Sequence, residues 1–248
     1  MGSATSINDK ANSQNELMSP PACEIWESRL RAAKLSGGVS SEAIHSMICR
    51  VVEAKELRGK VLDFGAGVGD LTRRLLAMKR FDHVAAADIV TSPADLEGAV
   101  EWTVHDLNVT FPGHDSAFDV VVASEVIEHL ENPRFVMREI YRILRPGGTV
   151  LVSTPNNESW RSLLSLMVRG HYVAFCESSY PAHIVALLRQ DLSRIFSEAK
   201  LAQPEFYYTD EGGIPCKPSI TWQRISFNLL KGRRFSDNIL AVANRPST

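Results

Sequence analysis

Apolar and polar positions alternate between two spacings along residues 60–154, and this change of spacing predicts strands separated by helices. Runs of apolar residues typical of buried strands occupy 60–67, 83–89, 100–107, 118–126 and 149–155. Helical spacing follows at 70–81 and at 133–144, where Asn132-Pro133 predicts a capped start, and Ser92-Pro93 predicts a further short helix. This order predicts an α/β fold, a mostly parallel sheet with helices on both faces.

The segments around this core have other patterns. Residues 1–21 are polar and predict a disordered tail, and 22–57 predict two helices that cover the core. The alternation of strand and helix patterns stops at 156–186. This segment is an aromatic- and histidine-rich insertion that predicts a lid over a substrate. A helix over 188–201 and two strands at 204–209 and 237–244 resume the pattern, as a hairpin around an excursion. We expect one domain over 22–248, with its central core at 58–155.

Composition narrows the class of protein. The 248 residues carry a net charge of −2, so the global basic field expected of a nucleic-acid-binding protein is missing. No apolar run is long enough to predict a transmembrane segment. The four cysteines show neither a CxxC pair nor metal-finger spacing, which favours reduced thiols and a cytoplasmic location. Oligomeric state is not predicted.

A glycine-rich loop follows the first strand. Gly65 and Gly67 let the backbone turn tightly and approach a ligand, and the next helix start offers unpaired N–H groups. A dinucleotide fingerprint needs its third glycine one residue later than Gly69, and Asp70 beside the loop would repel a pyrophosphate. Asp63 favours a cationic ligand end instead, such as an amino group or a sulfonium.

Two further carboxylates close the next two strands. Asp88 can accept hydrogen bonds from both hydroxyls of a ribose, the role of the acidic residue in nucleotide-binding folds. Asp106 can accept from an adenine amino group while Leu107 packs on the ring. A solvated position at a strand end is the alternative for Asp88.

The motifs DFGAGVG, AAADI, HDL, FDVVVASEVIEHL and ILRPGGTVLVSTPN, in this order, resemble the class I S-adenosylmethionine-dependent methyltransferases, most closely the ubiquinone-biosynthesis O-methyltransferase type. The resemblance covers about residues 58–156. It implies a Rossmann-like, seven-stranded sheet with an antiparallel last hairpin. It also implies S-adenosylmethionine as cofactor, S-adenosylhomocysteine as product, and a cofactor site built from Asp63, Phe64, Gly65, Ala66, Gly67, Asp88, Ile89, Asp106, Leu107, Ser124, Glu125 and Val126.

The segment Glu125-x-x-Glu128-His129 admits three roles. On a helix these residues would share one face and could bind a divalent cation such as Mg²⁺. The same letters resemble those of small-RNA 2′-O-methyltransferases and of some quinone O-methyltransferases. His129 can act instead as a general base, as can His171 or His183 of the lid, or it can be structural.

These motifs predict an enzyme that transfers a methyl group from S-adenosylmethionine to a small-molecule acceptor, with a hydroxyl oxygen favoured over nitrogen. Two alternatives remain: a metal-dependent RNA 2′-O-methyltransferase, and a member that binds the cofactor without catalysis. The basic cluster Lys231, Arg233 and Arg234 can meet an anionic substrate or a lipid headgroup, or can be a solvated turn.

Overall fold

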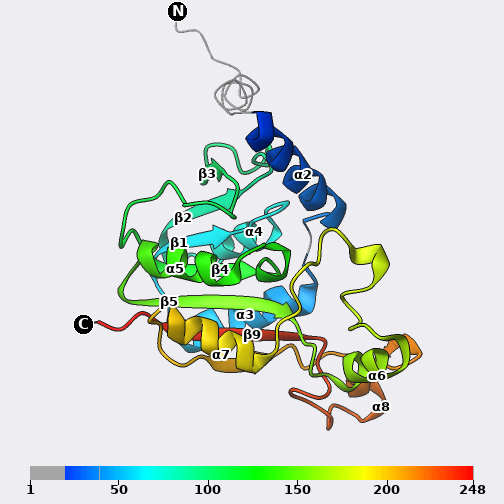
Figure 1. Cartoon of the computed structure of the whole chain (residues 1–248). Helices are drawn as coiled ribbons and strands as arrows, with labels where there is room; N and C mark the ends of the chain where they lie inside the picture. Colours follow the sequence, from blue (N-terminus) through cyan, green and yellow to red (C-terminus); the bar gives the residue numbers. More distant parts are fainter. Residues whose placement is uncertain (1–19, 39, 248) are drawn as a thin grey trace, which may run out of the picture.

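The described chain, residues 20–38 and 40–247 of this computed structural model, is built around a seven-stranded sheet (Figure 1). The strand order is β3-β2-β1-β4-β5-β9-β6, and β9 alone runs antiparallel to its neighbours, between β5 and β6. The prediction of a mostly parallel α/β sheet is confirmed, with β6 and β9 as its antiparallel pair. The strands are β1 (Gly59–Phe64), β2 (Phe81–Asp88), β3 (Glu101–Val104), β4 (Phe118–Ser124), β5 (Leu144–Pro155), β6 (Glu205–Tyr208) and β9 (Asn238–Asn244).

Helices cover both faces of the sheet. On one face, α3 (Glu42–Ala54) and α4 (Asp70–Ala77) share an apolar core with Val61 of β1. On the other, α5 (Pro133–Ile143) and α7 (Arg189–Glu198) pack with Leu62, its neighbour in the same strand. Successive side chains of a strand point to opposite faces, so a strand covered on both sides is apolar throughout.

The sequence predicts a helix correctly where a capping residue and a complete apolar stripe occur together. The Asn132 side chain accepts from the backbone N–H of Phe135 and starts α5, as predicted. The helix expected from Ser92-Pro93 is wrong, because residues 94–99 form only turns. Gly98 lies there with a φ of 77°, a left-handed conformation that a helix does not continue through.

The segments outside the core depart further from expectation. Helix α2 (Pro20–Ser36) begins inside the predicted tail, so residues 20 and 21 are helical, while 1–19 lie outside the described residues. The predicted lid contains α6 (Trp160–Arg169) and the 3₁₀ turn η2 (Glu177–Ser179). The excursion between β6 and β9 holds the short pair β7 (Gly213–Ile214) and β8 (Lys217–Thr221), then α8 (Trp222–Ile225).

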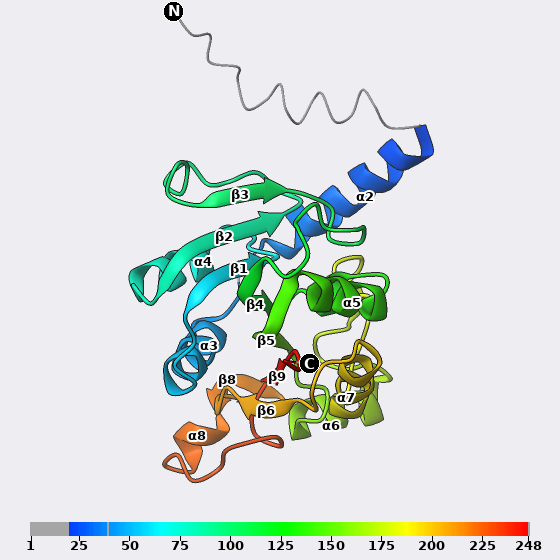
Figure 2. The ribbon, with the colours of Figure 1, turned by 90° about the vertical axis from the view of Figure 1, so that its left-hand side faces the viewer.

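The strand order reverses between β1 and β4, and the loops at their carboxyl ends surround a cavity. Such a reversal is where ligands bind in open α/β sheets. Figure 1 shows α2 lying at this edge of the sheet, and Figure 2 shows that it projects away from the helices α5 and α7. Within the described residues, none of the helices combines the length and the apolar character that crossing a membrane requires.

Candidate functional site

The cavity of about 390 Å³ collects nearly all the residues that the motifs predicted for the cofactor. Phe64 is the exception: it is buried against Phe111, because strand alternation turns it toward the core with Leu62. Phe64 therefore does not line the cavity, and its contact with the cofactor stays a prediction. The predicted residues that line the cavity are Asp63, Gly65, Ala66, Gly67, Asp88, Ile89, Asp106, Leu107, Ser124, Glu125 and Val126.

The glycine loop after β1 needs its glycines for shape. Gly65 and Gly67 have φ values of 88° and 54°, in the left-handed region that favours glycine. A Cβ on Gly67 would collide with the carbonyl of Gly38, and one on Gly65 would collide with Val126. The backbone N–H groups of Gly65 and Ala66 both donate to the carbonyl of Ala87, which ties the loop to β2. The loop therefore lines the cavity with bare backbone.

Asp63, near the end of β1, is a buried carboxylate, and only one of its two oxygens is hydrogen-bonded within the described structure. Its Oδ2 accepts from the hydroxyl of Thr72 at 2.6 Å, while its Oδ1 is buried and has no hydrogen-bond partner in the described structure. Burial, with a smaller contribution from the charge of Asp88, raises the pKa of Asp63 to about 7. A cationic ammonium group would satisfy both the free oxygen and the charge.

Asp88, at the end of β2, is fixed by the backbone around it. Its two oxygens accept from the N–H groups of Gly67 at 2.8 Å and of Val90 at 3.0 Å. Burial raises the pKa of Asp88, although these hydrogen bonds act in the opposite direction. Each oxygen keeps a second lone pair, so the position remains suited to two hydroxyl donors.

Asp106 is held by a partner that the sequence did not indicate. The guanidinium of Arg29, on α2, lies 2.5 Å from Oδ2 of Asp106 and 2.7 Å from Glu131. The other oxygen of Asp106 accepts from the backbone and side-chain N–H groups of Asn108. Arg29 and Asn108 also line the cavity. No spacing in the sequence joins α2 to the end of β3, so only the tertiary structure reveals this contact.

The segment Glu125-x-x-Glu128-His129 does not form the α-helix on which the metal hypothesis depended. Glu125 has a φ of 54°, and only Ile127–His129 form a 3₁₀ turn, η1. The Glu125 carboxylate accepts from Ser153 at 3.0 Å and from Asn238 of β9 at 2.9 Å. This positive φ, directly after β4, directs the Glu125 carboxylate away from the cluster that His129 forms with Glu128 and His183.

Glu128 lies behind the cavity wall. It is fully buried, accepts from the Thr154 hydroxyl at 3.1 Å, and leaves one carboxylate oxygen without a partner in the described structure. Burial raises the pKa of Glu128 well above its ordinary value, and the neighbouring charge of Glu125 adds to the effect. For Glu125, burial raises the pKa to about 7.

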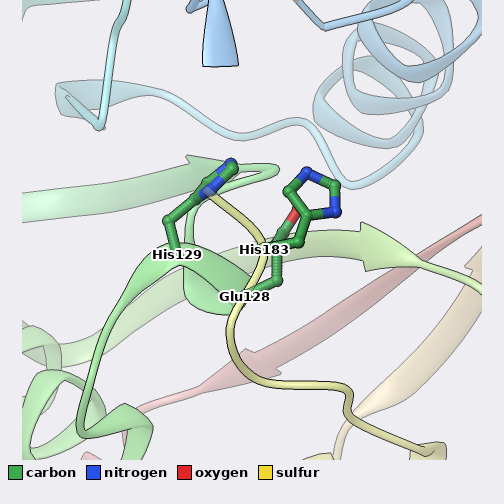
Figure 3. Close-up of side chains that lie close together, drawn as sticks. All are labelled: Glu128, His129 and His183. Atoms are coloured by element: carbon green, nitrogen blue, oxygen red, sulfur yellow. The ribbon is translucent and has the colours of Figure 1, made fainter. Parts of the chain in front are cut away.

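His129 and His183 meet edge to face at the cavity wall, with ring centroids 4.8 Å apart (Figure 3). Nδ1 of His129 lies 2.7 Å from the carbonyl oxygen of Ala182; a carbonyl only accepts, so Nδ1 donates and Nε2 keeps its lone pair. Burial lowers the pKa of both histidines, so both are neutral near pH 7. The other candidate base, His171, bonds only to the carbonyl of Tyr172 and does not line the cavity.

The group that could hold a metal differs from the predicted one. Glu128, His129 and His183 each offer a ligand atom within 4.8 Å of the others, while Glu125 is not among them. Two imidazoles and one carboxylate are a poor donor set for Mg²⁺, which prefers oxygen ligands. The magnesium site on Glu125, Glu128 and His129 stays a prediction, and within the described residues Glu125 lies outside the group that could hold an ion.

The predicted lid contributes little of its aromatic content to the cavity. Of residues 156–186, only Ala182 and His183 line it, and the backbone N–H groups of Ile184 and Val185 donate to the carbonyl of Glu128. The chain thus brings His183 to His129 by a backbone pairing across more than fifty residues. That the segment acts as a lid stays a prediction.

Known proteins resemble this chain in sequence. The model of a family described as methyltransferase domain matches residues 40–202. The chain is 32% identical over 123 residues to the mitochondrial ubiquinone biosynthesis O-methyltransferase of Rattus norvegicus, covering 46% of this chain and 36% of that protein. It is 29% identical over 103 residues to the ubiquinone/menaquinone biosynthesis C-methyltransferase UbiE of Roseobacter denitrificans, covering 38% and 41%. The matches span less than half the length of either relative.

Solved structures resemble it in fold. The 1,6-didemethyltoxoflavin-N1-methyltransferase of Burkholderia thailandensis, solved with its substrate and S-adenosylhomocysteine, superposes with a TM-score of 0.57 at 14% identity, over 99% of this chain and 93% of that one. The family match covers more than half of the chain and includes the glycine loop, Asp88 and Asp106. The chain therefore belongs to the methyltransferase-domain family, as a class I S-adenosylmethionine-dependent methyltransferase, and this confirms the fold, the enzyme class and the cofactor that its motifs predicted.

Proposed function

We propose that the protein methylates a hydroxyl oxygen of a small-molecule acceptor, with His129 as the general base. The observation that carries this proposal is the fixed tautomer of His129: the Ala182 carbonyl holds the proton on Nδ1, which leaves Nε2 free to accept one. The residue lines the same cavity as the glycine loop and Asp88. A hydroxyl nucleophile loses a proton on methylation, so a neutral imidazole in this cavity has a defined task.

The residues present fit S-adenosylmethionine. The unpartnered oxygen of Asp63 suits the ammonium group of the methionine part, and Gly65 and Gly67 line the cavity beside it. Asp88 suits the ribose hydroxyls, and Leu107 offers an apolar surface to the base. When bound, this cofactor supplies an electrophilic methyl group: an oxygen–carbon bond forms as the carbon–sulfur bond breaks, and the electron pair remains on sulfur.

In this proposal the fixed position of His129 matters for the reaction as much as its basicity does. Burial lowers its pKa, so it is neutral at pH 7 and able to accept the acceptor's proton at Nε2. His183 packs edge-to-face against it and restricts its ring. The protein thus holds the base still and keeps bulk water from it, while the cavity aligns the two reactants.

The relatives described above include O-, C- and N-methyltransferases. They support a small-molecule acceptor without deciding the atom that is methylated. The relative from Rattus norvegicus is an O-methyltransferase, and the free Nε2 of His129 favours a hydroxyl acceptor, which must lose a proton.

The experiment that tests the proposal combines binding with product analysis. Calorimetry should show that S-adenosylhomocysteine binds and NAD does not. Radiolabelled S-adenosylmethionine is then offered with panels of phenols and catechols, with amines, and with total RNA. Mass spectrometry of the labelled product should show an O-methyl ether of a small molecule. An N-methyl product, or label only in RNA, would contradict the proposal, and tight binding without any product would favour a non-catalytic member.

We also propose a cytoplasmic location. The cysteines Cys23, Cys49, Cys176 and Cys216 are free thiols in the described structure, which suits a reducing compartment. Fractionation of cells that express the tagged chain tests this; recovery in an oxidising compartment would contradict it.

A further inference from the structure

The structure assigns an anionic lipid surface as a docking partner for the face formed by α6 and the turn after α8, which we call the basic apolar face. It consists of residues 160–169 and 222–234. Both segments lie at the same end of the molecule in Figures 1 and 2, away from β3. They are joined directly: the backbone N–H of Trp160 donates to the carbonyl of Arg234, and the Arg234 guanidinium lies 5.1 Å from the centre of the Trp160 ring.

Large apolar side chains stand out from this face. Met167 on α6 is 83% exposed, and Phe227 and Leu229 in the turn are 88% and 84% exposed. Isolated exposed apolar residues are ordinary, but several of them at one end of a molecule favour an interaction site. The other exposed members are Leu164, Leu166, Val168 and Ile225.

The turn that presents Phe227 and Leu229 is held in shape by hydrogen bonds. The buried side chain of Gln223 donates to the carbonyls of Leu230 and Phe235 and accepts from the N–H of Gly212. The Ser226 hydroxyl accepts from the N–H of Leu230. Phe227 has a φ of 51°, in the left-handed region, so the scaffold holds the ring outward in a conformation that its side chain disfavours.

The charge of the basic apolar face indicates an anionic partner. The face contains six basic and no acidic residues, in a chain whose net charge is −2. Glu158 engages Arg233 and Arg189 at the margin. Asp237 likewise engages Arg161. Three exposed cations of the face, Arg169, Arg224 and Lys231, take part in no ion pair within the described structure.

A face that carries both exposed apolar side chains and unpaired cations matches the interface of a bilayer with anionic headgroups, where the apolar side chains enter the acyl boundary and the cations meet phosphate. A second copy of this chain fits less well, because the same cations would face each other across a two-fold interface. Nucleic acid fits the charge but not the aliphatic side chains, since its backbone attracts cations and its bases stack on aromatic rings.

Sedimentation with vesicles tests the inference. The whole chain should sediment with vesicles of phosphatidylcholine and phosphatidylglycerol, and far less with phosphatidylcholine alone, and added salt should release it. The double variant Phe227→Ser/Leu229→Ser should lower the partition coefficient roughly tenfold or more. Lys231→Gln should lower it roughly fivefold. The matched control Val109→Ser changes an exposed apolar residue on the loop after β3 and should bind as the original chain does.

Three results would overturn the inference. One is that the original chain does not sediment with anionic vesicles. Another is that Phe227→Ser/Leu229→Ser and a second variant, Met167→Ser/Val168→Ser, both sediment as well as Val109→Ser. The third is a dimer by analytical ultracentrifugation that the Phe227→Ser/Leu229→Ser variant abolishes, with no vesicle binding, which would give the face to a second copy. Circular dichroism verifies that each variant is folded; since the changed side chains are exposed, the melting temperature should stay near that of the original chain.

Discussion

The residues at the two ends of the cavity are positioned in different ways. At the cofactor end, Asp63 is the last but one residue of β1, Asp88 is the last residue of β2, and Asp106 comes two residues after the end of β3. At the other end, His129 ends the 3₁₀ turn η1 and His183 lies in irregular backbone, and hydrogen bonds from Ile184 and Val185 to the Glu128 carbonyl bring them together. The first arrangement is local, since a residue at the end of a strand must lie at the edge of the sheet. The second depends on long-range pairing, so it is free to change without disturbing the sheet.

The sharpest test of this contrast is His129→Ala. If His129 is the base, turnover should fall by about 10²- to 10⁴-fold, the usual contribution of a general base. The affinity for S-adenosylhomocysteine, measured by calorimetry, should stay within about threefold, because the cofactor end is independent of this side chain. His183→Ala is the matched comparison, and it should reduce turnover less. An equal loss of turnover and affinity would show that the two ends are not separable.

Gly67→Ala should have the next largest effect. The new Cβ would meet the Gly38 carbonyl in a backbone with positive φ, so the loop must move. Affinity for S-adenosylhomocysteine should fall about a hundredfold or more, equivalent to about 2.7 kcal/mol. Gly98→Ala is the control: its φ is also positive, but nothing lies near its Cβ, so it should lose only about 1–2 kcal/mol of stability. Similar affinities in the two variants would refute a tight loop.

Asp88→Ala comes third. It removes the predicted acceptor for two hydroxyls and leaves the Gly67 N–H without its partner, so cofactor binding should weaken by about 1.5–3 kcal/mol. Asp95→Ala is the control, because Asp95 is an exposed partner of Arg73 outside the cavity. Calorimetry on both variants measures the difference. Unchanged affinity in Asp88→Ala would mean that the ribose lies elsewhere.

The smallest effect concerns pH and Asp63. Its pKa in the folded chain, about 7, lies above the ordinary 3.8, so stability that is fully present below pH 3.8 is lost as pH rises toward 7. Asp63→Asn should lack this loss, and its melting temperature without ligand should exceed that of the original chain by more at pH 8 than at pH 5. Ligand affinity should show the opposite trend: for the original chain it should be about tenfold lower at pH 6 than at pH 8, and nearly constant for Asp63→Asn. Parallel pH profiles for the two chains would contradict the assignment of Asp63.

The sequence predicted the sheet and the cofactor end because both depend on short patterns. Apolar runs mark strands, and a carboxylate after such a run must lie at the sheet edge. It did not predict Arg29 beside Asp106, since α2 and β3 are far apart along the chain. It also misplaced Glu125, because a single residue with positive φ replaced the expected helix. Helical spacing would put Glu125 beside His129, but one left-handed residue put it beside Ser153 instead.

The position of β9 has a consequence for the order in which the protein is made. This strand follows β6 in the chain but lies between β5 and β6 in the sheet, and it supplies Asn238 to the cavity wall. On the ribosome, β1 to β5 can pair as they emerge, while β6 waits for a neighbour made about thirty residues later, a few seconds at ordinary rates of synthesis. Until β9 arrives, the edge of β5 is open to pairing with other chains. A pause in translation before residue 238 would therefore expose this edge for longer, and the finished site would appear only with the last strand.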